Sequence, residues 1–378
     1  MNIAIDALGI SRPGGGRSAT VNLLQALLVL DHENRYSVFL NRPEPWLSTF
    51  SNVRQVVLGE LPAIATRVWA QALVPLYLRR WRADLVHHVK NLNVIESPCP
   101  SIVTVYDLTI LRYPELYPPF DVWYWRHVEP RALRAASRVV AISRTTAEDL
   151  RRFYNLPADR VEVIYPSFAP GIATSRADPS EIRRRYGIEG QFVLHVGSIS
   201  RKKNLLTLFR AFHRLRARGL DLKLVLVGRT YQKGHDQSLG EFLTASEFAP
   251  DVIFTGPVPD ADLPGLYRAA AVVAFPSLHE GFGIVPVEAM AAGVPLVAST
   301  GGALAEVIGQ GGWLIQDAGD DAELADAIGQ ILRDRDLRDG LIARGLSRAG
   351  LFAPGRAAAQ TLDLYRRVAR SSRDAVDA

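Results

Sequence analysis

Short apolar segments alternate with longer amphipathic ones along most of the chain, and this alternation is what most constrains the fold. In the second half, residues 191–199 and 222–229 have the continuous apolar character of buried strands. Residues 204–218 between them repeat apolar positions at helical spacing. Strands joined by helices run parallel, and helices then cover both faces of the sheet. The pattern therefore predicts an α/β protein built on doubly wound parallel sheets.

The alternation starts twice. An apolar run at 2–7 leads through the glycine cluster "PGGGR" to a helix expected over 18–30, and the pattern restarts at 191. A chain of 378 residues is too long for one ordinary core. We therefore expect two Rossmann-like domains facing a central cleft, joined by the Pro-, Ser- and Gly-rich segment around Pro166–Glu181. The expected bounds are 1–168 and 189–355 for the domains, 169–188 for the linker and 356–378 for a last helix.

Composition excludes several classes of protein. Apolar residues make up 48% of the chain and charged residues 22%, as in soluble globular proteins. A single cysteine excludes an internal disulfide and a thiolate zinc site. His87 and His88 are adjacent on an expected strand and point to opposite faces, so we predict no metal. A net charge of +5 is too modest for a nucleic-acid protein. Neither a signal peptide nor an apolar stretch of membrane-spanning length is visible, so we expect a cytoplasmic location.

The stretch "HEGFGIVPVEAM", residues 279–290, predicts a ligand site. It follows an apolar strand at 271–277, and the carboxyl ends of parallel strands are where such sheets bind ligands. Pro286 suits the first turn of a helix, whose free amides favour a phosphate. Ionised carboxylates such as those of Glu280 and Glu288 only accept hydrogen bonds, so they suit hydroxyl groups. Phosphates flanked by hydroxylated rings describe a sugar nucleotide. The expected main-chain donors are the amides of Phe282, Gly283 and Ile284.

The segment "PSLHEGFGIVPVEAMAAGVPLVAS" resembles the Glu-x7-Glu signature of family 4 glycosyltransferases, which are retaining enzymes with the two-domain GT-B fold. Four further segments are similar to family patterns: "PGGGRSATVNLLQALL", "TVYDLTILRYPELYP", "VVAISRTTAEDL" and "LHVGSISRKKNLLTLFRAF". The residues that flank these segments most resemble those of the mannosyltransferase branch. That resemblance implies GDP-mannose as donor, with a UDP-sugar as the alternative, and a last helix that crosses back to the N-terminal domain.

The resemblance implies roles for individual residues of the second half. Glu280 would face the hydroxyls of the donor sugar, and Glu288 would accept from those of the ribose. Lys203 matches the lysine that the family places on the diphosphate. The arginine that the family carries five positions earlier falls on Ser198, so that Arg201 or Lys202 would replace its charge.

Roles in the first half are also implied by the resemblance. Gly15, Gly16 and Arg17 would approach the phosphate side of the donor and the acceptor. Tyr106 stands where the family often has a histidine, next to Asp107. A phenol can bond a hydroxyl but does not exchange a proton near neutral pH, since its reference pKa is near 10. Tyr106 and Asp107 are therefore expected to line the cleft, with their roles open.

The implied reaction breaks the bond between an anomeric carbon and a diphosphate, with metal-independent, front-face retention and no cofactor besides the donor. The acceptor would be a glycan or a lipid-linked saccharide bound by the N-terminal domain. Thr66–Arg82 mixes aromatic residues with arginines, which suits either a plain packing helix or a peripheral contact with an anionic membrane on its cytoplasmic face.

Other activities occur in the same fold class. A nicotinamide dehydrogenase should carry G-x-G-x-x-G after its first strand, and "GISRPGGGRSA" lacks that spacing. A sugar-nucleotide epimerase and a non-catalytic module that binds a nucleotide sugar stay open as alternatives.

Overall fold

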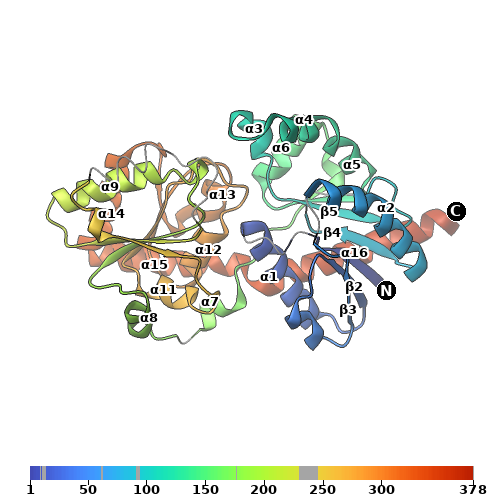
Figure 1. Cartoon of the computed structure of the whole chain (residues 1–378), viewed down its shortest axis with the longest axis horizontal. Coiled ribbons are helices and arrows are strands. Elements are labelled where there is room, and N and C mark those ends of the chain that lie inside the picture. Colours follow the sequence, from blue (N-terminus) through green and yellow to red (C-terminus); the bar gives the residue numbers. More distant parts are fainter. Residues whose placement is uncertain are drawn as a thin grey trace. The chain divides into compact units, whose positions relative to one another are not determined.

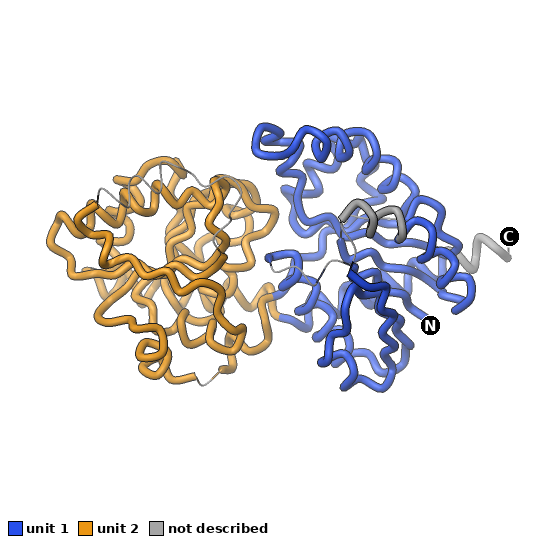
Figure 2. Tube along the Cα trace, in the orientation of Figure 1, with its two compact units in different colours: residues 1–167, 354–378 blue, residues 168–353 orange. Residues whose placement is uncertain are grey.

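The computed structural model describes residues 1–8, 10, 14–60, 63–90, 94–175, 177–229 and 246–377. They form two compact units (Figure 2). Unit 1 contains Met1–Ser167 together with Pro354–Ala378, and unit 2 contains Phe168–Ala353.

Unit 1 is built on a seven-stranded sheet with the order β3-β2-β1-β4-β5-β6-β7, all pairs parallel (Figure 1). The strands are β1 (Asn2–Asp6), β2 (Arg35–Leu40), β3 (Val53–Val57), β4 (Leu85–His88), β5 (Ser101–Val105), β6 (Arg138–Ala141) and β7 (Val161–Val163). The order reverses between β1 and β4, where Asp6 pairs in register with His88. That reversal is the point at which sheets of this type open a ligand crevice.

Seven helices of unit 1 lie within the described residues. They are α1 (Gly15–Leu30), α2 (Ala63–Trp81), α3 (Thr109–Arg112), α4 (Pro119–His127), α5 (Glu129–Ala135), α6 (Arg144–Tyr154) and α16 (Pro354–Asp377), with short 3-10 turns η1 (Pro45–Thr49), η2 (Pro114–Leu116) and η3 (Ala158–Arg160). Helix α6 begins as expected after Ser143, whose hydroxyl accepts from the amide of Thr146 at 3.0 Å.

The last helix belongs to the first unit although it follows the second in sequence. Leu364 and Tyr365 of α16 are fully buried in the same apolar cluster as Ile3 and Leu24. The Tyr365 hydroxyl also forms a 2.6 Å hydrogen bond with Nδ1 of His87, whose Nε2 lies 2.8 Å from the hydroxyl of Thr104. Helix α16 therefore completes the core of unit 1 through both apolar and polar contacts.

Unit 2 is built on a six-stranded parallel sheet with the order β10-β9-β8-β11-β12-β13. The strands are β8 (Phe192–Val196), β9 (Lys223–Val227), β10 (Val252–Gly256), β11 (Val272–Phe275), β12 (Leu296–Ser299) and β13 (Trp313–Ile315). Its helices are α7 (Pro170–Thr174), α8 (Pro179–Arg185), α9 (Leu205–Ala217), α11 (Leu263–Ala269), α12 (Ile284–Ala291), α13 (Leu304–Ile308), α14 (Asp321–Arg333) and α15 (Arg335–Ala349). The 3-10 turns are η4 (Arg201–Lys203), η5 (Ala249–Asp251), η6 (Gly309–Gly311) and η7 (Gly350–Phe352).

The strand order of unit 2 reverses between β8 and β11. Helices α9 and α14 pack on one face through the apolar cluster that includes Phe209, Leu215 and Leu324. Right-handed crossovers then place α11 and α12 on the opposite face, because these helices lead in the other direction along the sheet. The loops that follow β8 and β11 consequently lie side by side at the carboxyl edge.

The segment 169–188 differs from the expected linker. It contains α7 and α8, which belong to unit 2. Ile182 of α8 is buried against α11, where a Cβ on Gly265 would lie 2.5 Å from its side chain. Arg183 donates to the carbonyl of Ala269 at 2.6 Å. The lack of periodicity in this segment reflects two very short helices, which give too few turns for a helical pattern.

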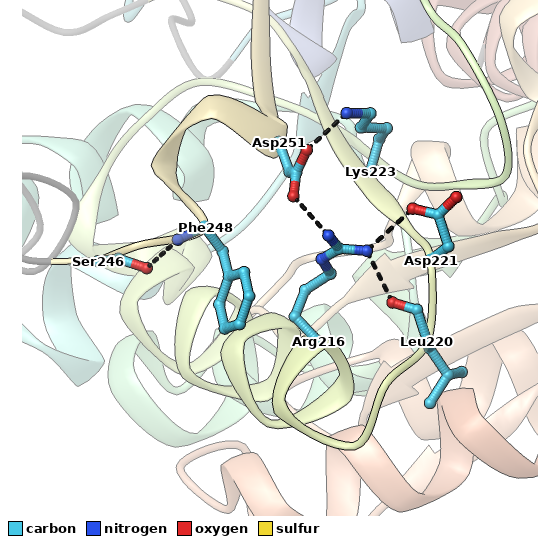
Figure 3. Close-up of polar contacts among 7 residues, drawn as sticks. All are labelled: Arg216, Leu220, Asp221, Lys223, Ser246, Phe248 and Asp251. Carbon is cyan, nitrogen blue, oxygen red and sulfur yellow. Dashed lines mark hydrogen bonds and ion pairs between the residues drawn. The ribbon is translucent and has the colours of Figure 1, made fainter.

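A cluster of polar contacts lies at the amino ends of β9 and β10 in unit 2 (Figure 3). Arg216 at the end of α9 lies 2.9 Å from Asp251 and 3.0 Å from Asp221. Asp251 also accepts from Lys223, the first residue of β9, at 2.5 Å. The Arg216 guanidinium lies over the ring of Phe248, 5.4 Å from its centroid. These contacts join α9, β9 and η5, so we assign the cluster to stability.

Candidate active site

The loops after β8 and β11 meet at the reversal point of unit 2. The loop after β8 ends in η4, which carries Arg201, Lys202 and Lys203. The loop after β11 carries Glu280 and the glycine turn. The amide of Leu278 donates to the carbonyl of Lys202 at 2.9 Å, which ties the two loops together. The topology thus brings cations and a carboxylate to one place.

Glu280 and Lys203 form an ion pair at the centre of this site. Nζ of Lys203 donates to Oε1 of Glu280 at 2.6 Å, and Nζ of Lys202 lies 3.8 Å from Oε2. The side chain of Glu280 is 12% exposed and that of Lys203 17%. Burial raises the pKa of Glu280, but the two lysines outweigh it and hold that pKa below its ordinary value. Glu280 is therefore ionised at neutral pH.

The main chain of Glu280 is held by the loop after β12. Its amide lies 3.3 Å from the carbonyl of Gly301, and its carbonyl accepts from the amide of Ala303 at 2.8 Å. A Cβ on Gly301 would lie 2.3 Å from the carbonyl oxygen of Leu278, and one on Gly302 would lie 2.3 Å from that of Glu280. Two glycines are required here because backbone approaches backbone.

Helix α12 begins directly after the glycine turn. Gly283 precedes it with φ of 95°, and a Cβ there would lie 2.6 Å from the side chain of Leu304. The first amides of a helix have no acceptor within it, so the amides around Gly283 and Ile284 can serve an anion. The ring of Phe282 is buried edge-to-face against Phe352, with centroids 5.4 Å apart. Only the main chain of Phe282 can therefore serve a ligand.

Glu288 lies within α12 and is buried. Its Oε2 accepts from the hydroxyl of Tyr267 on α11 at 2.9 Å. Burial raises the pKa of Glu288 to about 7, with Asp260 adding to the rise and the Tyr267 bond opposing it. The two glutamates of the motif therefore differ: Glu280 is ionised beside lysines, whereas Glu288 titrates near neutral pH beside a tyrosine.

Ser198 and Arg201 are the remaining expected residues of unit 2. Ser198 lies in the loop before η4, and Arg201 is exposed at its start. Within the part of the chain that the structure describes, Glu280 forms its ion pairs with Lys202 and Lys203 and none with Arg201. The structure therefore favours Lys202 over Arg201 as the second cation beside Glu280.

In unit 1, Gly15 and Gly16 form the first turn of α1, with open space where a Cβ would lie. Arg17 donates to the carbonyl of Ile10 at 2.9 Å and to Oε1 of Glu44 at 3.0 Å. The guanidinium of Arg17 is thus already engaged by a buried carboxylate, which the sequence did not predict.

Tyr106 and Asp107 follow β5. The hydroxyl of Tyr106 lies 2.8 Å from that of Thr20 on α1, and burial raises the pKa of Tyr106 to about 12. Asp107 accepts from the amide of Thr109 at 3.0 Å. These contacts orient both side chains from α1 and from the start of α3.

Two family models match the chain and between them span most of it. Residues 13–170 match the model described as Glycosyltransferase Family 4, and residues 178–348 match Glycosyl transferases group 1. The chain is also 30% identical over 286 residues to O-antigen chain mannosyltransferase B of Escherichia coli, covering 75% of this chain and 74% of that protein.

The chain belongs to the family 4 glycosyltransferases.

Solved structures agree on the fold of this glycosyltransferase. Sucrose-phosphate synthase from Thermosynechococcus elongatus has a TM-score of 0.80 at 21% identity, covering 98% of this chain and 100% of that one. HepE from Anabaena, solved with UDP-glucose, has a TM-score of 0.78 at 22% identity, covering 96% and 99%. The predicted GT-B fold, with two parallel-sheet α/β domains, is confirmed.

His195 lies near Lys203 and Glu280, and the sequence interpretation missed it. The imidazole of His195 stacks on the ring of Phe275, with centroids 5.7 Å apart. Nζ of Lys203 lies 4.7 Å from the centroid of the Phe275 ring. Nδ1 of His195 donates to the carbonyl of Ala274 at 3.0 Å, and burial lowers the pKa of His195 to about 4. The ring is neutral, so Nε2 carries the lone pair. A histidine within an apolar strand gives no signal of this kind.

The sequence interpretation also missed a pair of residues at the reversal point of unit 1. Nδ1 of His88 lies 2.8 Å from Oδ2 of Asp6, and both residues are buried. Oδ1 of Asp6 accepts from the amide of Leu8 at 3.1 Å. His87, by contrast, bonds Tyr365 and Thr104, so the two histidines point to opposite faces as expected.

The described residues of the glycosyltransferase include no cluster of three or more histidine, cysteine, aspartate or glutamate side chains suited to a metal ion. Within the same ranges, no helix combines the length and apolar character needed to cross a bilayer.

Helix α2 carries the segment expected either to pack or to meet a membrane. Val74 and Leu78 are buried, while Leu76, Arg79 and Arg80 are exposed. The side chains of Arg67 and Trp69 lie outside the described residues. From residue 70 on, where its side chains are described, α2 thus packs through one face and presents an apolar and basic face to the outside.

Proposed function

We propose that this enzyme transfers a hexosyl group, mannose from GDP-mannose, to a glycan or a lipid-linked saccharide with retention at the anomeric carbon. The observation that carries the proposal is the Lys203–Glu280 pair at the reversal point of the unit 2 sheet. It sets a cation for a diphosphate beside a carboxylate for sugar hydroxyls. The name of the E. coli relative supports mannose as the sugar.

The proposed donor site uses residues of unit 2. Lys203, with Lys202 near it, stabilises the negative charge that develops on the leaving diphosphate. The first amides of α12 add neutral donors to the same charge. Electrostatic stabilisation of this kind is worth roughly 3 kcal/mol for each contact. Glu280 accepts from hydroxyls of the sugar, and Glu288 accepts from those of the ribose.

The proposed transfer is metal-independent and proceeds by attack on the front face, with the leaving phosphate accepting the proton of the acceptor hydroxyl. Gly15 and Gly16 allow main-chain approach to the substrates, because no side chain occupies the space above them. Tyr106 lies beside α1 as a neutral hydroxyl that can orient a sugar. A phenol with a pKa of about 12 is not the proton acceptor.

The proposed acceptor contact includes an anionic membrane surface near α2. Exposed Leu76 and the arginines Arg79 and Arg80 would provide an apolar and a basic contact for such a surface. Cosedimentation with vesicles of neutral and of anionic lipid tests this part by itself. Equal binding to both, or binding to neither, would exclude it without affecting the donor assignment.

The experiment that tests the function is a thermal-shift panel with GDP, UDP and ADP and their sugar forms, followed by transfer assays in EDTA. GDP-mannose should raise the melting temperature most, because a ligand bound only by the folded state stabilises it. A stronger shift with UDP-glucose, the ligand of HepE, would move the assignment to a UDP-sugar. Donor turnover without any acceptor would favour an epimerase.

A further inference from the structure

Under the proposed function, two anions bind the single ammonium group of Lys203: the carboxylate of Glu280 and the diphosphate of the donor. In the structure, Oε1 of Glu280 lies 2.6 Å from Nζ, at the distance of a charge-assisted hydrogen bond. The diphosphate of a donor would need the same ammonium. Any nucleotide that binds here must therefore compete with Glu280.

The pair is largely shielded from water, which makes this competition substantial. Both side chains are less than a fifth exposed, and Lys202 approaches only the second carboxylate oxygen, at 3.8 Å. The main chain of Glu280 is held by the loop after β12, since its amide and carbonyl both bond that loop. The ammonium of Lys203 can turn away from Glu280, because it ends a flexible four-carbon stem.

The intact sugar nucleotide and the nucleoside diphosphate left after transfer differ in the hydrogen-bond donors that they offer to Glu280. When Lys203 turns to the diphosphate, the carboxylate loses its closest hydrogen-bond donor. The hydroxyls of an attached sugar can replace that donor, because an ionised carboxylate accepts from hydroxyl groups. A nucleoside diphosphate lacks the transferred hexose, so it has no hydroxyl group at that position.

We propose that Glu280 makes the site selective for the intact sugar nucleotide over the nucleoside diphosphate, by taking Lys203 back once the sugar has left. This inference rests on the proposed donor site. It assigns Glu280 a second task besides contact with the sugar, which is to weaken the hold on the product. Product release is a step that limits the turnover of many enzymes.

The test measures dissociation constants by calorimetry for GDP and GDP-mannose, and for UDP and UDP-glucose, with the wild type and Glu280→Gln. The glutamine keeps the shape of the side chain and removes its charge. We expect the variant to bind the nucleoside diphosphate roughly tenfold more tightly, which corresponds to about 1.4 kcal/mol. Its preference for the sugar-bearing form should shrink, since the amide is a poorer acceptor for the sugar hydroxyls.

Two controls separate this competition from a general effect of charge. Lys203→Met combined with Glu280→Gln should bind the diphosphate no more tightly than Lys203→Met alone, because the freed ammonium is then missing. A gain that persists in this background overturns the inference. Glu288→Gln removes a carboxylate that bonds Tyr267 rather than Lys203, and it should give no gain.

The outcomes also distinguish the inference from the function beneath it. If the wild type binds these nucleotides and Glu280→Gln binds the diphosphates equally or less tightly, the competition is refuted and the donor site stands. If the wild type binds none of the nucleotides, the proposed function and the inference both fail. Glu280→Ala, with melting curves recorded without ligand, guards against an effect caused by the glutamine itself or by misfolding.

Discussion

Tyr267 and Glu288 join α11 to α12 through a hydrogen bond of 2.9 Å, and both residues are buried. The pKa of Glu288 rises to about 7 because burial penalises its charged form. An ionisable group at this place makes both folding and binding depend on pH in the neutral range.

The first prediction concerns this pH dependence. Between pH 4.5 and about 7, folded Glu288 keeps a proton that the unfolded chain has lost. The stabilising contribution is therefore fully present below pH 4.5 and is lost as the pH rises through 7, by roughly 3 kcal/mol. Glu288→Gln should remove this part of the slope. Urea unfolding of both proteins from pH 4 to pH 8 measures it, and parallel profiles would contradict the shift.

The second prediction ranks the cations of η4. Lys203→Met should lower kcat/KM by about a hundredfold or more, because it removes a contact with the leaving diphosphate. Lys202→Met should cost less, since its ammonium lies further from Glu280. Arg201→Gln, at an exposed position, should cost least. Steady-state kinetics with saturating acceptor gives the order, and an equal loss in all three would refute the central place of Lys203.

The third prediction contrasts two glycines. Gly283 has φ of 95°, and its Cβ would overlap Leu304, so Gly283→Ala should destabilise the protein by about 2 kcal/mol or more. Gly16 is helical with open space around it, so Gly16→Ala should leave stability unchanged or raise it by up to about 1 kcal/mol. Melting curves test both. Transfer should nevertheless fall in Gly16→Ala if substrate approaches that main chain.

The fourth prediction concerns Asp6 and His88. Asparagine at position 88 keeps a donor near the place of Nδ1, whereas glutamine places one near Nε2. His88→Asn should therefore keep Asp6 satisfied, and His88→Gln should cost about 1–3 kcal/mol by leaving a buried carboxylate oxygen unpaired. Unfolding in urea distinguishes them. Greater stability of the glutamine variant would show that Nε2, rather than Nδ1, is the atom that donates to Asp6.

Local patterns in the chain were sufficient for the fold class. Strand and helix alternation depends on the spacing of neighbouring residues, so the two parallel sheets could be inferred without coordinates. The glycine turn before α12 could be inferred for the same reason, since Gly283 and Pro286 act within one turn of chain. The short helices α7 and α8 escaped notice because a few residues carry no period.

Contacts between side chains that are distant in sequence could not be inferred in this way. Lys203 and Glu280 are 77 positions apart, and they meet because the strand order reverses between β8 and β11. His88 and Asp6, 82 positions apart, meet at the corresponding reversal of unit 1. Neither pairing follows from residue types, since each depends on which strands become neighbours and on which face each side chain lies. Residue types along the chain therefore specify which chemical groups are present, while the packing of distant strands specifies which of them touch and which retain their charge.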